Sequence, residues 1–456
     1  MKPLVLIQGP VATRSGYGNH TRDLAIALIK SNKYDIKIVS LPWGSTPMNA
    51  LDPNIPDHIE ISNRILRQNL DKQPDVFIQV SVPNEFCLAP DGKTHVRPGK
   101  FNIGVTAGIE TTIAPPAFIE GVNRMDLVLT TSEFSKQGFI ESIYDAVDEK
   151  TKQPKGKLKV EKPIEVLFEG VDLDVYKKTT DIHETVKEEL SNIKDSFCYL
   201  FVGHWLKGDH GQDRKDIGMM IKTFCEAFKK KSSHNRPGLI LKTSHATFSI
   251  IDRDMMFQKI QNVIAPYGKN APNIYLLHGD LSDSEMNSLY NHSKVKAMVS
   301  FTKGEGYGRP LAEFGLTGKP IIASDWSGHR DFLKYATMLP GGLTQVHASA
   351  ADKFILKEAN WFTVNYGYAG KVLQDVMQNY KKYCEISRKQ PQHMKTNFSL
   401  DKMAELFVQI VDKGLSSMPQ QVALNLPKLK KVKQPSAYVG VNSNNVKLPK
   451  LKKIEA

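Results

Sequence analysis

The sequence predicts an α/β protein made of two doubly wound, Rossmann-like domains that face each other across a cleft. Two observations support this fold class. Short apolar runs that suit buried strands alternate with longer stretches of helical periodicity, and the alternation occurs in two separate series. A polar stretch at residues 174–195 separates the two series. Because doubly wound sheets bind ligands at the carboxyl ends of their strands, we expect the functional site to lie in the cleft.

The first series gives an N-terminal Rossmann-like domain, residues 1–173. A helix is predicted at residues 20–31, where Leu24, Ala27 and Leu28 recur at helical spacing. The predicted strands of this series are residues 4–8, 36–41, 76–80, 102–106, 127–131 and 164–167.

After a linker at residues 174–195, the second series gives a C-terminal Rossmann-like domain, residues 196–368. Residues 369–418 are expected to form closing helices, at 369–387 and 400–413, that pack back over the junction. Residues 419–456 are expected to be a basic, disordered tail. The predicted strands of the second domain are residues 198–202, 239–241, 274–277, 297–301 and 321–323, and its predicted helices include residues 217–230 and 282–290.

Composition fits a chain with two sizeable cores. Of the 456 residues, 41% are hydrophobic and 24% are charged, which are globular values. No apolar stretch approaches the ~18 residues that span a bilayer, and the apolar N-terminal run is too short for a signal peptide. The four cysteines are far apart and form no C-x-x-C pair. This pattern predicts a cytoplasmic location, without disulfides or structural zinc.

The most informative segment is the glycine-rich turn at residues 302–313, which follows an apolar run at 295–301. Glu305 lies in the turn, and Glu313 lies two helical turns further along the predicted helix. With 3.6 residues per turn, both carboxylates can point toward the same cleft. A strand, a glycine-rich turn and a helix N-terminus also leave backbone N–H groups available to an anion. An ordinary capped connection between strand and helix is the alternative.

With Pro310, this E-x7-E spacing resembles the motif of retaining, nucleotide-sugar-dependent glycosyltransferases of the GT-B fold (group 1, or family 4-like). The resemblance extends from about residue 4 to residue 332. It includes residues 165–172, where Glu169 replaces the asparagine of the family pattern. Further segments that resemble the family, in the same order, are residues 108–112, 126, 132–134 and 319–328. The chain is also similar to glycosyltransferases encoded by large tailed bacteriophages.

The resemblance implies a donor site in the second domain. Glu305 would lie beside the transferred sugar, and Glu313 would accept hydrogen bonds from the donor ribose. Arg214 and Lys215 would hold the diphosphate, because cationic groups stabilise the charge that grows as the glycosidic bond breaks. The predicted catalytic residues are therefore Glu305, Arg214 and Lys215. The turn residues Gly306, Tyr307, Gly308 and Arg309 complete the predicted donor site, with Arg309 as a further phosphate ligand.

The family often has an arginine directly after the first strand of this domain, where this chain has His204. Because this arginine is missing, we expect Arg214 and Lys215 to make more of the contacts with the phosphates. A solvated charge cluster at a helix start is the alternative interpretation of these two residues.

The glycine-rich loop at residues 9–19 follows the first predicted strand. In the resembled family this loop covers the donor phosphates, and Gly16 and Gly18 would let the backbone approach an anion. Arg14 is expected to add charge or contact the acceptor, and Glu110 is expected to orient the acceptor hydroxyl. A dehydrogenase is disfavoured, because the loop lacks G-x-G-x-x-G and no acidic residue ends the second strand. A loop that only turns the chain is the alternative.

No metal site is predicted. The two D-x-D look-alikes, at residues 172–174 and 252–254, are poorly placed for one. No cofactor is expected besides the co-substrate, a UDP- or GDP-linked sugar. In the implied retaining mechanism the donor phosphate takes the proton of the acceptor, so no side-chain base is required.

The distribution of positive charge indicates which class of acceptor the protein would bind. The net charge is +13, and the tail from residue 419 contains eight lysines against Glu455 alone. A second group of six lysines lies between Lys150 and Lys162. Clustered lysines suit a polyanion such as DNA or an anionic membrane surface. Several of the phage enzymes that the chain resembles glycosylate hydroxymethylated cytosine, so double-stranded phage DNA in a host cytoplasm is the expected acceptor.

Three alternatives stay open. A glycosyltransferase of envelope polysaccharide or glycolipid would use the lysines on anionic headgroups. A non-catalytic nucleic-acid-binding protein on a GT-B scaffold would transfer no sugar, although the intact Glu305 and Glu313 disfavour it. The tail could also serve only to keep the protein in solution. The sequence does not specify an oligomeric state.

Overall fold

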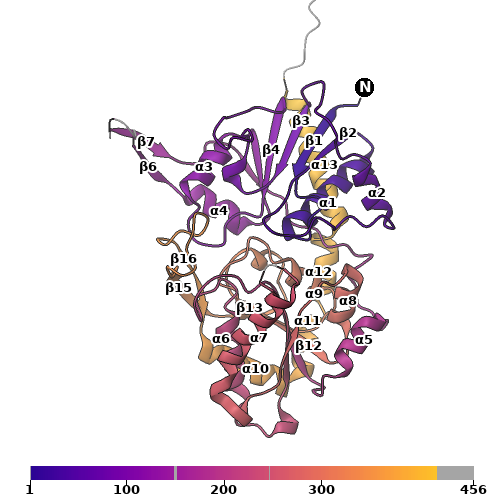
Figure 1. Cartoon of the computed structure of the whole chain (residues 1–456), viewed down its shortest axis with the longest axis vertical. Helices are drawn as coiled ribbons and strands as arrows, with labels where there is room; N and C mark the ends of the chain where they lie inside the picture. Colours follow the sequence, from indigo (N-terminus) through magenta and orange to yellow (C-terminus); the bar gives the residue numbers. More distant parts are fainter. Residues whose placement is uncertain (1, 148–150, 152, 246, 419–456) are drawn as a thin grey trace, which may run out of the picture. The chain divides into compact units, whose positions relative to one another are not determined.

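The computed structural model describes residues 2–147, 151, 153–245 and 247–418. The basic tail from residue 419, and Lys150 and Lys152 of the second lysine group, lie outside the described residues. Two parallel sheets of six strands each, with helices on their faces, confirm the predicted α/β fold class (Figure 1).

The first sheet has the strand order β2-β1-β3-β4-β5-β8, and all of its strands are parallel. Its central strands are buried on both faces, as the continuous apolar runs predict. The strands are β1 (Leu4–Gly9), β2 (Asp35–Ser40), β3 (Val76–Val80), β4 (Phe101–Thr106), β5 (Leu127–Thr130) and β8 (Ile164–Val166).

The second sheet has the order β11-β10-β9-β12-β13-β14 and is also fully parallel. In both sheets the chain starts in the interior and the strand order reverses beside the first strand, which places a crevice at the carboxyl edge. The strands are β9 (Cys198–Val202), β10 (Gly238–Lys242), β11 (Ile274–Leu277), β12 (Val295–Ser300), β13 (Ile321–Ser324) and β14 (Thr337–Leu339).

Two antiparallel hairpins were not part of the predicted fold. The first pairs β6 (Tyr144–Val147) with β7 (Pro154–Leu158), and β7 carries Lys155 and Lys157 of the second lysine group (Figure 1). The second pairs β15 (Gly341–Gln345) with β16 (Asn360–Val364). Neither β7 nor β15 has a buried residue. Without a buried face, these strands carry no apolar alternation that sequence reasoning could detect.

The helices cover the faces of the two sheets. The segment predicted as one helix at residues 369–387 is two helices, because the backbone leaves the helical conformation at Asn379 (φ −111°, ψ 35°). The helices are α1 (Gly16–Ser31), α2 (Pro56–Ser62), α3 (Pro116–Asn123), α4 (Glu133–Glu141), α5 (Glu184–Ser191), α6 (Ile217–Phe228), α7 (Ile250–Ile264), α8 (Asp283–Asn291), α9 (Arg309–Gly315), α10 (Tyr366–Gln378), α11 (Tyr380–Ser387), α12 (Gln390–Asn397) and α13 (Leu400–Ser417).

The last helix returns to the first domain. Met403, Phe407 and Val411 recur on one face of α13 and are fully buried in the core formed by β1, β3 and α1. The segment 174–195 contains α5, whose Val186 and Leu190 are buried in the core of the second domain. The chain therefore crosses between the two domains twice, once before α5 and once before α13.

Candidate active site

The turn between β12 and α9 packs directly against the first domain. A Cβ atom placed on Gly304 would lie 1.9 Å from the carbonyl oxygen of Glu110, and one on Gly306 would lie 1.9 Å from that of Ala107. Side chains at these positions would push the turn away from the loop that follows β4. The two glycines therefore allow the close approach of the two carboxyl edges.

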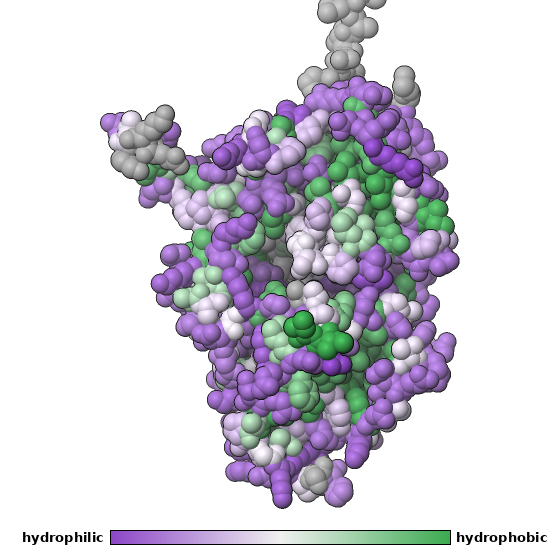
Figure 2. Space-filling model, in the orientation of Figure 1, coloured by the Kyte–Doolittle hydropathy of each residue, from purple (hydrophilic) through white to green (hydrophobic). Residues whose placement is uncertain are grey.

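Hydrogen bonds fix this contact. The carbonyl oxygen of Gly306 accepts from the Ser132 hydroxyl at 2.6 Å and from the Thr131 hydroxyl at 3.2 Å. Both hydroxyls belong to the segment between β5 and α4 and are buried. The space-filling view shows a recess at mid-height, between the parts of the molecule that carry the two sheets (Figure 2).

Glu305 is buried in this turn between two cationic groups. Its Oε1 forms an ion pair with the Lys215 ammonium, and its Oε2 lies 3.2 Å from Nη1 of Arg214. Burial acts to raise the pKa of Glu305, but the charges of Lys215 and Arg214 outweigh it and lower the pKa to about 2. Glu305 is therefore a carboxylate at any pH at which the protein would work.

Arg214 connects the two domains. Its Nη1 donates to the carbonyl oxygen of Gly304 at 2.8 Å, and its Nε lies 3.0 Å from Oε2 of Glu110 in the first domain. Burial raises the pKa of Glu110, against the charge of Arg214. The structure thus brings together Glu305, Arg214, Lys215 and Glu110, which are separated by up to 195 residues in the sequence.

Glu313 lies on α9 and both of its carboxylate oxygens are held. The Tyr290 hydroxyl donates to Oε2 at 2.9 Å, and Nε of Arg309 lies 3.1 Å from Oε1. Burial raises the pKa of Glu313 to about 7, in spite of the nearby charge of Arg309. The two glutamates of the turn therefore have opposite pKa shifts.

Arg309, predicted as a phosphate ligand, is engaged with carboxylates. Its Nη1 lies 2.7 Å from Oδ2 of Asp23 on α1 and 3.8 Å from Oε2 of Glu169. Glu169 is the residue that replaces asparagine in the resembled pattern, and its carboxylate and Arg309 partly balance each other. Burial raises the pKa of Glu169 to about 7.

The other turn residues have mainly structural surroundings. The Tyr307 ring is buried against Phe332, with 4.8 Å between the ring centroids. Gly308, the N-cap residue that precedes α9, has a φ of 100°, a conformation that favours glycine. A contribution of Tyr307 to donor binding would have to come from its backbone.

The first glycine-rich loop is ordered by its own contacts. The Ser15 hydroxyl caps α1 by accepting from the backbone N–H of Gly18 at 3.0 Å. A Cβ atom on Gly18 would lie 2.3 Å from the carbonyl oxygen of Thr13, whereas one on Gly16 would meet nothing within 4 Å. Arg14 forms a half-exposed ion pair of 2.9 Å with Asp280 of the second domain. Gly18 is therefore required for the turn itself, and Arg14 lies at the cleft.

Sequence reasoning missed a buried network beneath Arg214 and Lys215. The Lys303 ammonium, 2% exposed, lies 3.4 Å from Oδ2 of Asp216, which precedes α6. The Tyr366 hydroxyl donates to the same carboxylate oxygen at 2.6 Å. Burial raises the pKa of Asp216 to about 6. This network holds the start of α6, and hence the two cationic residues, in place.

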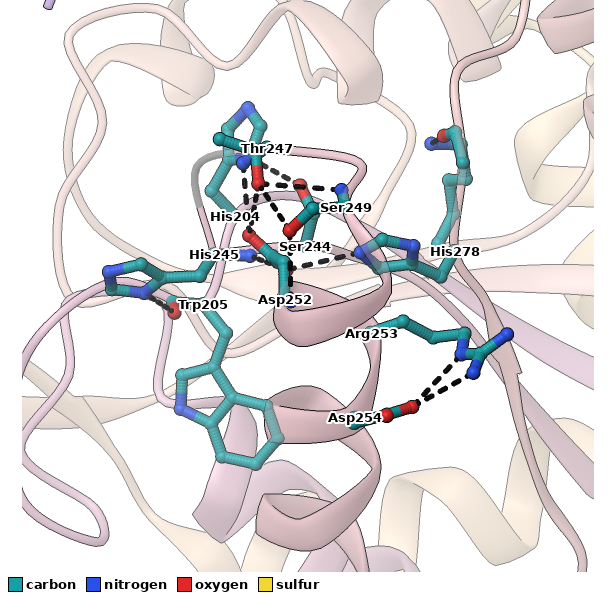
Figure 3. A network of polar contacts seen from close by, with 12 residues as sticks. His204, Trp205, Ser244, His245, Thr247, Ser249, Asp252, Arg253, Asp254 and His278 are labelled. Atoms are coloured by element: carbon teal, nitrogen blue, oxygen red, sulfur yellow. Dashed lines mark hydrogen bonds and ion pairs between the residues drawn. The ribbon is translucent and has the colours of Figure 1, made fainter. Parts of the chain in front are cut away.

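A second polar network joins three loops at the carboxyl edge of the second sheet (Figure 3). The buried Asp252 carboxylate accepts from the backbone N–H of His245 at 2.9 Å and lies 3.1 Å from Nε2 of His278. Nδ1 of His204 lies 3.1 Å from the Ser244 hydroxyl. The loops after β9, β10 and β11 are thereby linked into one surface.

His204 stands where the resembled family often has arginine. Loss of hydration, followed by the charges of Lys215 and Lys242, lowers its pKa to about 4. The imidazole is neutral near pH 7 and supplies no positive charge. The positive charge at this edge therefore comes from Arg214 and its neighbouring lysines.

Among the described residues, no group of three or more histidine, cysteine or carboxylate side chains could hold a metal ion. None of the helices that the structure describes combines the length and the apolar character needed to cross a membrane.

The described part of the chain is similar in structure to several known proteins. Sucrose-phosphate synthase from Thermosynechococcus elongatus gives a TM-score of 0.59 at 11% identity, covering 91% of this chain and 100% of that chain. A glycosyltransferase from Rickettsia africae gives 0.56 at 14% identity, covering 91% and 99%. HepE from Anabaena, in complex with UDP-glucose, gives 0.54 at 12% identity, covering 90% and 99%.

No protein-family model matches the sequence, and no curated protein sequence matches it either. At these low identities the similarity to solved structures concerns the fold. The two parallel sheets, their strand order and the near-complete coverage establish that this chain has the GT-B fold.

Proposed function

We propose that this protein is a retaining glycosyltransferase that moves a sugar from a nucleotide sugar to a hydroxyl acceptor. One observation carries the proposal. Glu305 is held between Lys215 and Arg214 in the turn after β12, and Glu313 follows on α9, the short helix that comes after this turn. The structural likeness to HepE in complex with UDP-glucose supports a UDP-linked donor, and GDP is the alternative.

The proposed roles follow from the charges. The diphosphate would take Arg214 and Lys215 as partners, which would release them from Glu305 and Glu110. Preorganised cations of this kind stabilise the negative charge that develops on a leaving diphosphate. Glu305, which these two cations keep ionised in the structure, would then face the sugar and balance the positive charge of its oxocarbenium-like state. Glu313 would accept hydrogen bonds from the ribose hydroxyls.

The transfer balances without a side-chain base. The bond between the anomeric carbon and the phosphate oxygen breaks, and its electron pair stays with the diphosphate. The acceptor oxygen forms the new bond on the same face of the sugar. Its proton passes to the departing phosphate oxygen, so the products are a glycoside and a nucleoside diphosphate. Because Arg214 and Lys215 carry the charge at this edge, we propose that the reaction needs no metal ion.

For the acceptor we propose DNA with hydroxymethylated cytosine. The support is electrostatic: the net charge is +13, and eight lysines lie in the tail. On the described hairpin, β7 has no buried residue, although Lys157 already pairs with Asp145. Lysines of this kind would contact the phosphate backbone without reading sequence. The base would have to leave the stack for its hydroxymethyl oxygen to reach the recess.

The test is to incubate the protein with a panel of nucleotide sugars and hydroxymethylated duplex DNA, followed by digestion to nucleosides and mass spectrometry. A nucleoside heavier by one sugar residue supports the whole proposal. Sugar transfer to a lipid or oligosaccharide instead would refute the DNA acceptor and retain the donor chemistry. If no donor is transferred or hydrolysed, the chain is a binding protein on a GT-B scaffold.

A further inference from the structure

One arginine and three carboxylates, one of which is Glu313, form a buried cluster that joins the two domains. Nη1 of Arg309 lies 2.7 Å from Oδ2 of Asp23 and 3.8 Å from Oε2 of Glu169, and its Nε lies 3.1 Å from Oε1 of Glu313. The exposed fraction of each of these side chains is 15% or less. We refer to these four residues as the Arg309 cluster.

Each carboxylate of the cluster comes from a different part of the chain. Asp23 lies on α1 of the first domain, Glu169 follows β8 where the chain leaves that domain, and Glu313 lies on α9 of the second. The aspartate and the arginine are 286 residues apart in the sequence. Any movement that separated the two sheets would pull Asp23 away from the guanidinium.

The geometry makes this contact directional. A guanidinium presents its N–H groups in a rigid plane, so fixing one edge of the group also fixes the other. Asp23 holds the Nη1 edge of Arg309, while the Nε edge holds Oε1 of Glu313. The Tyr290 hydroxyl holds the second oxygen of that carboxylate. The orientation of Glu313 therefore depends on a residue of the opposite domain.

The neighbouring histidine does not change this charge balance. His20 is buried, and within the described part of the chain neither of its ring nitrogens has a hydrogen-bond partner. Burial, and then the charge of Arg309, lowers the pKa of His20 to about 3, so the ring is neutral near pH 7. Arg309 thus supplies the positive charge between Asp23 and Glu313.

We propose that Asp23 and Arg309 are positioning residues, which couple the approach of the two domains to the orientation of Glu313 toward the donor nucleotide. The coupling rests on the proposed function, because it takes Glu313 to be the ribose ligand. When the domains are together, Asp23 turns the guanidinium so that Glu313 is held with both oxygens in place. When they separate, Arg309 and Glu313 lose this alignment and the donor is held less tightly.

The test variant is Asp23→Asn. It keeps the shape of the side chain and leaves the carboxyl groups of Glu169 and Glu313 beside Arg309. We expect the Kd for the nucleoside diphosphate that the unaltered protein binds, UDP or GDP, to rise about tenfold by calorimetry. The matched control is Asp57→Asn on α2, whose carboxylate pairs with Lys30 on the exposed surface at 2.7 Å. The control should leave the Kd unchanged.

A double-variant cycle separates positioning from a general structural effect. If Asp23 acts through Glu313, then Asp23→Asn combined with Glu313→Gln should bind the nucleotide no more than about twofold more weakly than Glu313→Gln alone. Full multiplication of the two effects, or an unchanged Kd in Asp23→Asn, would overturn the coupling.

The outcomes also separate this inference from the proposed function. If the unaltered protein transfers sugar and binds the nucleotide while Asp23→Asn does both equally well, only the coupling is wrong. If the unaltered protein binds neither UDP nor GDP and hydrolyses no donor, the proposed function is wrong and the coupling is wrong with it.

Discussion

The substitution Glu313→Gln should abolish sugar transfer and, at the same time, make the folded protein more stable at alkaline pH. Moving the pKa of Glu313 from 4.5 to about 7 costs its ionised form about 3 kcal/mol in the folded state. Below pH 4.5 the carboxyl is protonated in both the folded and the unfolded chain, so it has no effect on stability. Above pH 4.5 only the unfolded chain ionises, and the folded state loses stability until the pH passes about 7.

Glutamine removes this cost and keeps the shape of the side chain. Its amide oxygen can still accept from Arg309 or Tyr290, which now donate to the carboxylate. We therefore expect the difference in free energy of unfolding, variant minus unaltered protein, to increase by about 2–3 kcal/mol between pH 5 and pH 8.5.

The assay is urea unfolding at several pH values, with no nucleotide present. The control is Glu188→Gln on α5, which removes an exposed carboxylate and should shift stability little at any pH. A difference between Glu313→Gln and the unaltered protein that stays constant from pH 5 to pH 8.5 would refute a carboxyl group held protonated in the folded state. Near-normal sugar transfer by the variant would refute its place in the donor site.

The other predictions concern charge and binding. Lys215→Ala should slow transfer about 10²–10³-fold, because it removes one preorganised cation. The control Lys222→Ala, on the exposed face of α6, should leave the rate of transfer unchanged. Equal rates for the two variants would contradict the assignment of Lys215 to the phosphates. Activity should survive excess chelator, since Arg214 and Lys215 supply the positive charge, and a strict requirement for Mg²⁺ or Mn²⁺ would argue against this. A chain ending at Met418 should bind DNA more weakly yet hydrolyse the donor normally, in a gel-shift and a nucleotide-release assay. Binding of the full chain to DNA should weaken steeply with salt, and affinity that is independent of salt would exclude backbone contacts by lysine.

Local periodicity predicted eleven of the twelve strands of the two sheets and missed the edge strand β14 (Thr337–Leu339). A buried parallel strand is an apolar run that requires no knowledge of its partner, and the predicted strands agree with the observed ones within about two residues at each end. The strands β7 and β15 have no buried residue and so leave no such pattern. Their hairpins were missed although β16 buries Trp361, Phe362 and Val364. The break at Asn379 was missed because the helical spacing of apolar residues continues through both α10 and α11.

The candidate site was partly predictable. Glu305 and Glu313 lie in one short segment. The grouping of Arg214 and Lys215 with Glu305 was expected from the resemblance to glycosyltransferases of the GT-B fold, and the structure places both cations beside Glu305. The roles assigned to these residues stay predictions. Nothing in the sequence indicated that Arg309 faces carboxylates instead of solvent or ligand.

By itself, the sequence determined most strands of the two sheets, their order in the chain and the residues that the turn brings to the edge of the second sheet, because these depend on side chains close together in the chain. Only the tertiary structure decided which charged groups, far apart in the sequence, form ion pairs. Asp23 and Arg309, or Lys303 and Asp216, become partners when two surfaces pack and exclude water. The strength of such a pair depends on burial and on distances of a few ångströms. Neither quantity is a property of local sequence, and both determine whether Glu313 is held protonated while Glu305 stays ionised.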